Sequence, residues 1–134
     1  MKPDIQLNLG RETSDEEVDE IVSAFSPYFE ISYQRNILRL SADWLPLIID
    51  FAVAAVGGGI LYDALKGALI TLREKFRAKK LARNPAAVVR VRNETYVVTA
   101  EKLFLQSIDV ELHFNSVEEF VAYLRAKDKE TSNN

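Results

Sequence analysis

The fold of this chain depends on one apolar stretch, Trp44-Leu-Pro-Leu-Ile-Ile-Asp-Phe-Ala-Val-Ala-Ala-Val-Gly-Gly-Gly-Ile-Leu-Tyr62, which is followed by a basic run at residues 73–83. From residue 42 to residue 82 only the glycines interrupt a helical pattern, in which apolar side chains recur at intervals of three and four. Such spacing is typical of a helix that buries one face. The sequence therefore predicts a long apolar central helix, with residues 44–76 as its apolar part.

This predicted helix is too long for the domain around it. At 1.5 Å per residue it would be about 60 Å long, whereas a compact domain of this size has a diameter of about 36 Å. Gly57, Gly58 and Gly59 mark the expected break, because each glycine costs about 1 kcal/mol in a helix interior. We expect a kink or a helical hairpin at these glycines. The alternative is a helix that projects from the domain and needs a partner.

The residues before the central stretch predict a β-α-β unit. Residues 4–9 alternate apolar and polar side chains, as a half-buried strand does. Ser14 and Glu17 have the spacing of a capping box at the start of a helix. The apolar residues of that helix are Val18, Ile21, Val22 and Phe25. The strand after it is expected to point inward with Phe29, Ile31 and Tyr33.

The residues after the central stretch predict a hairpin, a further strand and a closing helix. The hairpin joins residues 87–91 to residues 96–99, and residues 109–114 alternate like a strand. Residues 100–106 fit either a short strand or one helical turn. The closing helix begins at Ser116, boxed by Glu119, and its apolar residues are Val117, Phe120, Val121 and Leu124.

Length and composition indicate one globular domain of the α+β class. The chain has 134 residues, of which 48% are hydrophobic and 28% charged, so it is long enough and apolar enough to bury a core. We assign residues 1–126 to a single α+β domain and residues 127–134 to a flexible C-terminal tail. No signal peptide is recognised at the N-terminus, so a cytoplasmic location is expected, with membrane association left open.

The sequence argues against several classes of function. It has no cysteine, which excludes disulfides, thiolate catalysis and cysteine-based zinc sites. Its net charge of −3 argues against a nucleic-acid partner. No catalytic, metal or nucleotide motif stands out, so we expect no enzyme and no cofactor. His113, the only histidine, is interpreted as a surface strand residue.

Two carboxylates in the apolar stretch require partners, because a buried charge is costly. Asp63 has Lys66 three residues later, which suggests an ion pair within the helix. Asp50 has no cation nearby in the sequence. It is expected to face solvent or a basic group elsewhere, such as Arg35 or Arg39.

Small residues recur every four positions along the predicted helix, and this spacing lets two helices approach closely. The stripe suits self-association, with close packing against the protein's own sheet as the alternative. Trp44 would anchor such an interface or the core. The residues of the predicted interface are Trp44, Ala55, Gly58, Gly59, Asp63 and Gly67.

A cluster of cations ends the predicted helix. It would meet an anionic membrane surface or an acidic partner, or it would complement the helix macrodipole. Membrane insertion of residues 44–62 is a separate alternative, opposed by the cost of about 2.5–3.5 kcal/mol for Asp50 near the centre of the span. The basic patch consists of Arg73, Lys75, Arg77, Lys79, Lys80 and Arg83.

The order of these predicted elements resembles the effector-associated constant component proteins of bacterial conflict systems. The matching stretch is Phe51-Ala-Val-Ala-Ala-Val-Gly-Gly-Gly-Ile60, continued to Leu72 and Arg73 and followed by the hairpin at residues 88–98. This resemblance implies a non-enzymatic adaptor that accompanies protease or other effector modules. The chain departs from the family in an additional strand segment at residues 100–114 and in the two acidic residues of the helix.

The sequence as a whole predicts a non-enzymatic interaction or adaptor module that self-associates through the apolar helix 44–76. Its expected partners are a second copy or another protein. One alternative is a membrane-docked or membrane-inserting protein that uses the same helix and its basic end. A second alternative is an acidic immunity or antitoxin protein, with an acidic patch formed by residues 15–20, Glu118 and Glu119.

Overall fold

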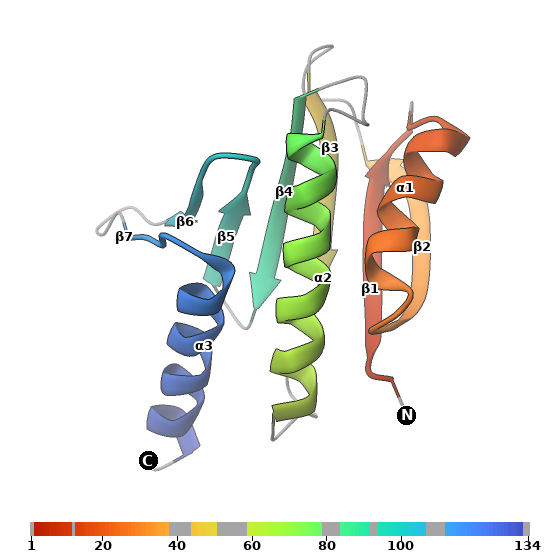
Figure 1. The fold of residues 1–134 in the computed structure, drawn as a ribbon. Helices are drawn as coiled ribbons and strands as arrows, with labels where there is room; N and C mark the ends of the chain where they lie inside the picture. The colour runs from red at the N-terminus through yellow and green to blue at the C-terminus, as the bar shows by residue number, and fades with distance from the viewer. Residues whose placement is uncertain are drawn as a thin grey trace.

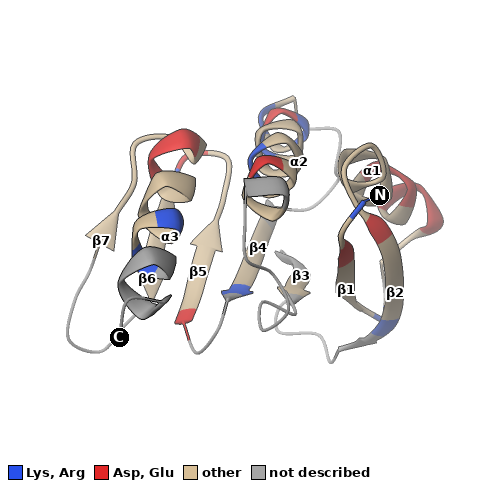
Figure 2. Ribbon diagram, turned by 90° about the horizontal axis from the view of Figure 1, so that it is seen from below, with Lys and Arg blue, Asp and Glu red and all other residues tan. Residues whose placement is uncertain are grey.

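In the computed structural model, residues 2–11, 13–37, 44–50, 59–78, 84–91, 94–106 and 112–132 are described. This part of the chain forms a seven-stranded sheet with three helices on one side of it (Figures 1 and 2). The predicted α+β class is confirmed. The strands are β1 (Asp4–Gly10), β2 (Glu30–Ile37), β3 (Trp44–Asp50), β4 (Asn84–Val91), β5 (Glu94–Val98), β6 (Leu103–Gln106) and β7 (Leu112–His113), and the helices are α1 (Asp15–Phe25), α2 (Gly59–Arg77) and α3 (Val117–Ser132).

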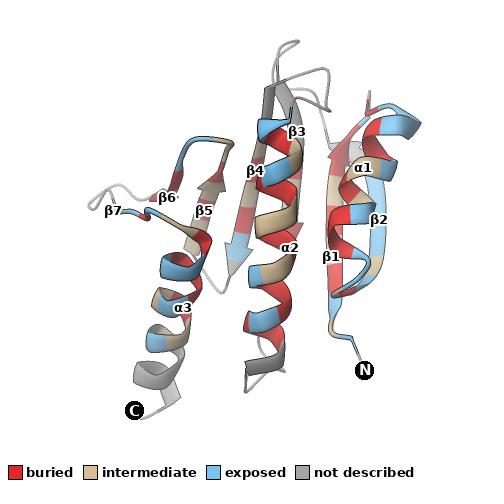
Figure 3. Cartoon of the chain, viewed as in Figure 1, coloured by how far each residue is buried: buried red, intermediate tan, exposed pale blue. Residues whose placement is uncertain are grey.

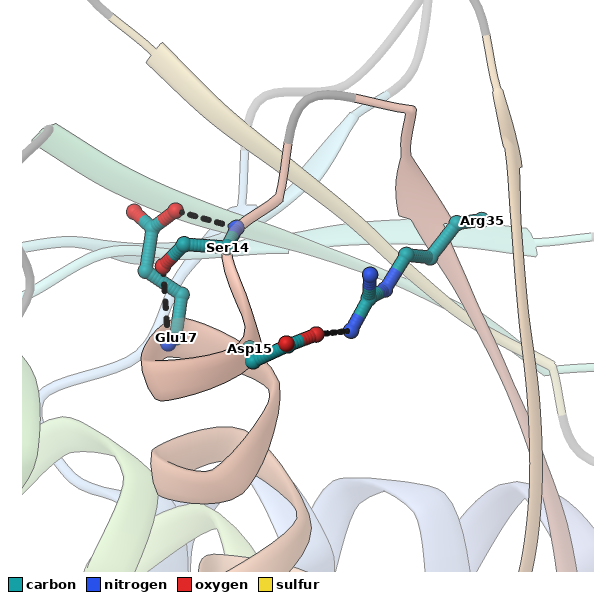
Figure 4. Close-up of polar contacts among 4 residues, drawn as sticks. All are labelled: Ser14, Asp15, Glu17 and Arg35. Atoms are coloured by element: carbon teal, nitrogen blue, oxygen red, sulfur yellow. Dashed lines mark hydrogen bonds and ion pairs between the residues drawn. The ribbon is translucent and has the colours of Figure 1, made fainter.

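The predicted β-α-β unit is confirmed, because β1 and β2 are parallel neighbours joined through α1. The capping box is also present. The Ser14 hydroxyl accepts a hydrogen bond from the Glu17 N–H at 3.1 Å, and the Glu17 carboxylate accepts one from the Ser14 N–H at 2.9 Å (Figure 4). The strand β2 presents Tyr33 to the helix-covered side of the sheet, as predicted, but this side chain is 49% exposed instead of buried. The reason is that β2 is the end strand of the sheet, which runs in the order β2-β1-β3-β4-β5-β6-β7.

The predicted long central helix is wrong in its first half. Residues 44–50 form β3, which lies between β1 and β4, antiparallel to the first and parallel to the second. Leu47 and Ile49 are buried and Ile48 is half-buried, so both faces of the strand are apolar. A continuous apolar run of this kind fits a central strand as well as a buried helix. Pro46, expected in a first helical turn, is instead the strand partner of Ala86.

The second half of the predicted helix is α2, which begins at Gly59. This glycine therefore opens a helix instead of kinking one, while Gly57 and Gly58 lie outside the described residues. Because β3 and β4 are parallel, α2 is the crossover between them and forms a second β-α-β unit.

The last part of the chain completes the sheet with antiparallel strands. The predicted hairpin is confirmed, with Val88 opposite Val97. The ambiguous segment at residues 100–106 contains the strand β6. Of the strand predicted at residues 109–114, residues 112–113 form β7, and residues 107–111 lie outside the described part. The helix α3 continues to Ser132, so the predicted tail is helical as far as that residue.

The core lies between the sheet and the helix layer (Figure 3). Tyr96 of β5 packs against Phe120 of α3 with ring centroids 4.8 Å apart, and Phe114 lies 5.4 Å from the same phenylalanine. All four apolar residues predicted for the closing helix are buried. Of the four predicted for α1, Val18, Ile21 and Phe25 are buried and Val22 is half-buried.

Candidate functional site

The sheet has one face that no described helix covers. Across this face an apolar row runs through four neighbouring strands in direct register. Each member is half-buried, whereas the residues directly before and after it along its strand are buried in the core on the other side of the sheet. The row consists of Ile48 of β3, Val88 of β4, Val97 of β5 and Phe104 of β6.

Polar residues bound this apolar row on several sides. In register, Asn8 of β1 lies next to Ile48, and His113 of β7 lies next to Phe104. The adjacent row carries Arg90, Thr95 and Gln106. An apolar patch with a polar rim is the usual layout of a protein–protein contact surface.

Over β1 and β2, the face of the sheet that carries the apolar row is polar. Gln6 of β1 pairs in register with Ser32 of β2, and the Ser32 hydroxyl donates a hydrogen bond to the Gln6 side-chain oxygen at 2.9 Å. The helix-free face is thus apolar over β3 to β6 and polar over β1 and β2.

The apolar row was not predicted from the sequence, because the central stretch also fits a helix. A signal was available in the strands themselves. In β3, β4 and β5 apolar residues are adjacent, as in Val88-Val89 and Val97-Val98, whereas β1 alternates apolar with polar residues. Adjacent apolar residues in a strand place one on each face, so the second face is apolar as well.

The apolar side chains of the predicted central helix that lie in α2 are largely buried within the chain. The apolar face of α2 is buried in the core, at Leu61, Tyr62, Ala64, Leu65, Ala68, Leu69, Leu72 and Phe76. Gly67, expected to allow a second helix to approach, lies against Tyr28: a Cβ built on it would be 2.5 Å from a ring carbon of that tyrosine. The close approach at this glycine is thus made by the protein's own tyrosine.

Asp63 is an exposed residue of α2 that pairs with Arg125 of α3. This pair joins two helices, so the predicted ion pair between Asp63 and Lys66 within one helix is wrong. Of the remaining predicted interface residues, Trp44 is the first residue of β3 and Gly59 the first of α2. Ala55 and Gly58 lie outside the described residues.

The predicted basic patch is not a single surface. Arg73 is only 7% exposed, and its guanidinium donates to the carbonyl oxygens of Thr99, at 3.1 Å from Nε, and Ala100, at 3.3 Å from Nη2. Burial lowers the pKa of Arg73, and the nearby charge of Arg77 lowers that pKa further. This arginine fixes the turn between β5 and β6 to the helix layer.

The other described cations of the run make contacts in different directions. The Arg77 Nε donates to the Ala100 carbonyl at 3.2 Å, while Lys75 pairs with Glu20 of α1 at 2.9 Å. Lys79, Lys80 and Arg83 lie outside the described residues. Among the described cations, the contacts hold α2 to its neighbours on both sides.

The predicted acidic patch is divided between the two outer helices. Asp15 lies at the start of α1, and Glu118 and Glu119 lie in the first turn of α3. The helix α2 separates them (Figure 2). Asp15 also pairs with Arg35 of β2 at 2.6 Å (Figure 4). The surroundings predicted for the Asp50 side chain lie outside the described side chains.

Two observations concern the chemistry of the chain: the position of His113 and the grouping of possible metal ligands. His113 is exposed on β7, and its ring lies 5.3 Å from that of Phe104. In the described ranges, no three histidine, aspartate or glutamate side chains gather in a group that could hold a metal ion.

The membrane-inserting form of the membrane alternative predicts a helix that could cross a bilayer. Among the helices in the described part of the chain, none is both long enough and apolar enough to do so. Comparisons with protein-family models, with characterised proteins and with solved structures gave no significant match.

Proposed function

We propose that this chain is a non-enzymatic interaction module that self-associates through the helix-free face of its sheet. The observation that carries the proposal is the apolar row of Ile48, Val88, Val97 and Phe104, which crosses four strands on a face that no described helix covers. In this proposal the apolar row takes the place of the predicted apolar helix as the contact surface, because the apolar face of α2 is already buried in the core.

The size of the row supports a contact between sheets. Neighbouring strands are about 4.8 Å apart, so four side chains in register form a ridge about 15 Å wide. Two sheets that pack face to face lie about 10 Å apart and interlock such side chains into a core. A second sheet placed on the row would remove four partly exposed apolar side chains from water.

The distribution of polar residues favours a second copy as the partner. A two-fold axis through the row would place apolar side chains of one copy on those of the other. The acidic side chains Asp4 and Glu30 are in register on β1 and β2, away from the row. Such an arrangement therefore buries no like charges at its centre, in a chain whose net charge is −3.

The adaptor role implied by the resemblance to effector-associated constant component proteins is compatible with such a module. In that role, self-association would bring together several copies of the protein that each chain binds. The family assignment itself stays a prediction.

Light scattering coupled to size-exclusion chromatography tests the proposal. We expect the wild-type chain to have the mass of a dimer, and Val88→Lys/Val97→Lys to have the mass of a monomer with an unchanged circular dichroism spectrum. Lysine is tolerated at partly exposed strand positions but not in an apolar interface. The matched control is Ser23→Lys/Ala122→Lys, which adds the same charge at exposed helix positions and should remain dimeric.

A wild-type chain that stays monomeric at millimolar concentration would refute self-association. A dimer whose mass is the same in all three proteins would refute this surface.

A further inference from the structure

We propose that the edge strand β2, with the acidic side of α1 beside it, binds an extended basic segment of another protein as an additional strand. This surface is separate from the apolar row, and the inference does not depend on self-association. It concerns what the module would bind at the end of its sheet.

β2 has the properties of a strand that can accept a neighbour. It is eight residues long and ends the sheet order, so among the described strands it pairs only with β1. In the described part of the chain no strand pairs with the side of β2 that points away from β1, so a further strand could add there. No proline interrupts residues 30–37, so each of them has a backbone N–H.

The side chains of β2 are accessible as well. Residues 32–35 are all exposed, and Ile31 is half-buried (Figure 3). Tyr33, at 49% exposure, is the single exposed large apolar side chain among the described residues. It lies in register with the core residue Leu7, so its ring is on the helix side of the sheet. An alkyl stem from a neighbouring strand would cover this ring.

The helix beside this edge is acidic where it meets the strand. Asp15 reaches across to Arg35 of β2, which places this side of α1 next to the edge (Figure 4). Asp19, one turn further along α1, is exposed, and its negative charge acts on the same arginine. The pKa of Arg35 is raised mainly by its hydrogen bond to Asp15.

The charges at this end of the molecule are unequal. Among the described residues 2–37, the carboxylates are Asp4, Asp15, Glu16, Glu17, Asp19, Glu20 and Glu30, and the cations are Lys2, Arg11 and Arg35. Lys2 donates to the Ser26 carbonyl at 2.9 Å, and Arg35 is paired with Asp15. The edge therefore carries an excess of negative charge, and this favours a basic occupant.

The same charges disfavour a second copy as the occupant of this edge. Antiparallel pairing of two β2 strands keeps the two helix layers on the same side of the joined sheet. It would bring the acidic side of one α1 toward the acidic side of the other, with mutual repulsion. A lysine of a foreign strand would instead lay its stem on Tyr33 and its ammonium group near Asp19.

The test uses peptides as long as β2, with blocked ends, and follows their binding by amide chemical shifts of the full chain. The probe alternates lysine with threonine. One control peptide replaces lysine by glutamate, and another keeps the lysines but replaces two threonines by proline, which removes backbone donors. We expect the lysine peptide to bind more weakly as salt rises, with its shifts centred on residues 30–35 and α1.

Protein variants separate strand addition from general attraction to negative charge. Asp19→Lys should weaken binding of the lysine peptide about fivefold, which is typical of exposed ion pairs. Glu118→Lys, the same change in the first turn of α3, should leave binding unchanged. Both positions are exposed, so both variants should fold.

Three results would overturn the proposal. The first is equal binding of the proline peptide, because attraction without a ladder would then suffice. The second is equal weakening by Asp19→Lys and Glu118→Lys. The third is a concentration-dependent shift of the β2 amides without peptide, which would identify a second copy as the occupant. None of these depends on whether the apolar row forms a dimer, since Val88→Lys/Val97→Lys can be tested with the same peptides.

Discussion

Replacement of Gly67 by alanine tests how α2 packs, since two effects of opposite sign meet at this position. Alanine is favoured over glycine inside a helix by about 1 kcal/mol. The new methyl group would stand 2.5 and 2.6 Å from two ring carbons of Tyr28, where real contacts are far longer. Crowding of this kind costs about 1–3 kcal/mol. We therefore expect Gly67→Ala to lower the free energy of unfolding by about 1 kcal/mol.

A double-mutant cycle isolates the contribution of the tyrosine. In a Tyr28→Ala background the crowding disappears and only the helix preference remains, so Gly67→Ala should raise the free energy of unfolding by about 1 kcal/mol. The sign of the effect thus reverses between the two backgrounds, with a coupling of about 2 kcal/mol. Urea denaturation followed by circular dichroism measures all four proteins, with equal denaturant slopes as the condition for comparison.

The reasoning fails if Gly67→Ala stabilises both backgrounds equally, because the tyrosine ring would then not lie against this glycine. If the glycine served a helix contact between copies, Gly67→Ala would instead change the mass in solution. That change would be the same with or without Tyr28.

Three further substitutions test local features of the fold by urea denaturation. Ser14→Ala removes the capping box of α1 and should lower the free energy of unfolding by about 1 kcal/mol. Ser23→Ala changes an exposed serine inside the same helix and should leave the free energy of unfolding unchanged. Equal effects of the two substitutions would argue against the cap. Arg73→Ala should cost about 1–3 kcal/mol because it strips two carbonyls of a buried donor, while Arg77→Ala, exposed and with one such bond, should cost less than about 1 kcal/mol. Phe120→Ala should cost about 3–5 kcal/mol, since this fully buried ring contacts the aromatic cluster under α3, and a cost below that of Arg77→Ala would contradict the packing.

The elements with local signals could be predicted from the sequence. The pattern of Ser14 and Glu17 specifies a helix start within four residues, and the alternation in residues 4–9 specifies a strand with one buried face. The hairpin was predicted from two apolar runs, residues 87–91 and 96–99, that are separated by a polar turn. The closing helix was predicted from the spacing of its apolar residues. In the first strand and in the two outer helices one period, either two or three to four, fits the residues, and the alternative would expose the apolar side chains.

Residues 44–50 lack such a signal, because they are apolar at nearly every position and fit both a strand and a helix. Their conformation depends on neighbours distant in sequence: β1 on one side and β4 on the other provide the backbone partners that make a strand. The apolar row depends on the same pairing. Adjacent apolar residues indicate a strand that is apolar on both faces, but only the register of four strands places the members of the row side by side.

The sequence by itself thus determined the α+β class, the first β-α-β unit, the hairpin and the closing helix, because their signals are local. Only the tertiary structure decided which apolar side chains are buried in the core and which lie on the second face of the sheet. Gly67 meets Tyr28, and the guanidinium of Arg73 meets the carbonyls of Thr99 and Ala100. Such contacts join residues far apart in the chain, and only the pairing and packing of whole elements bring them together.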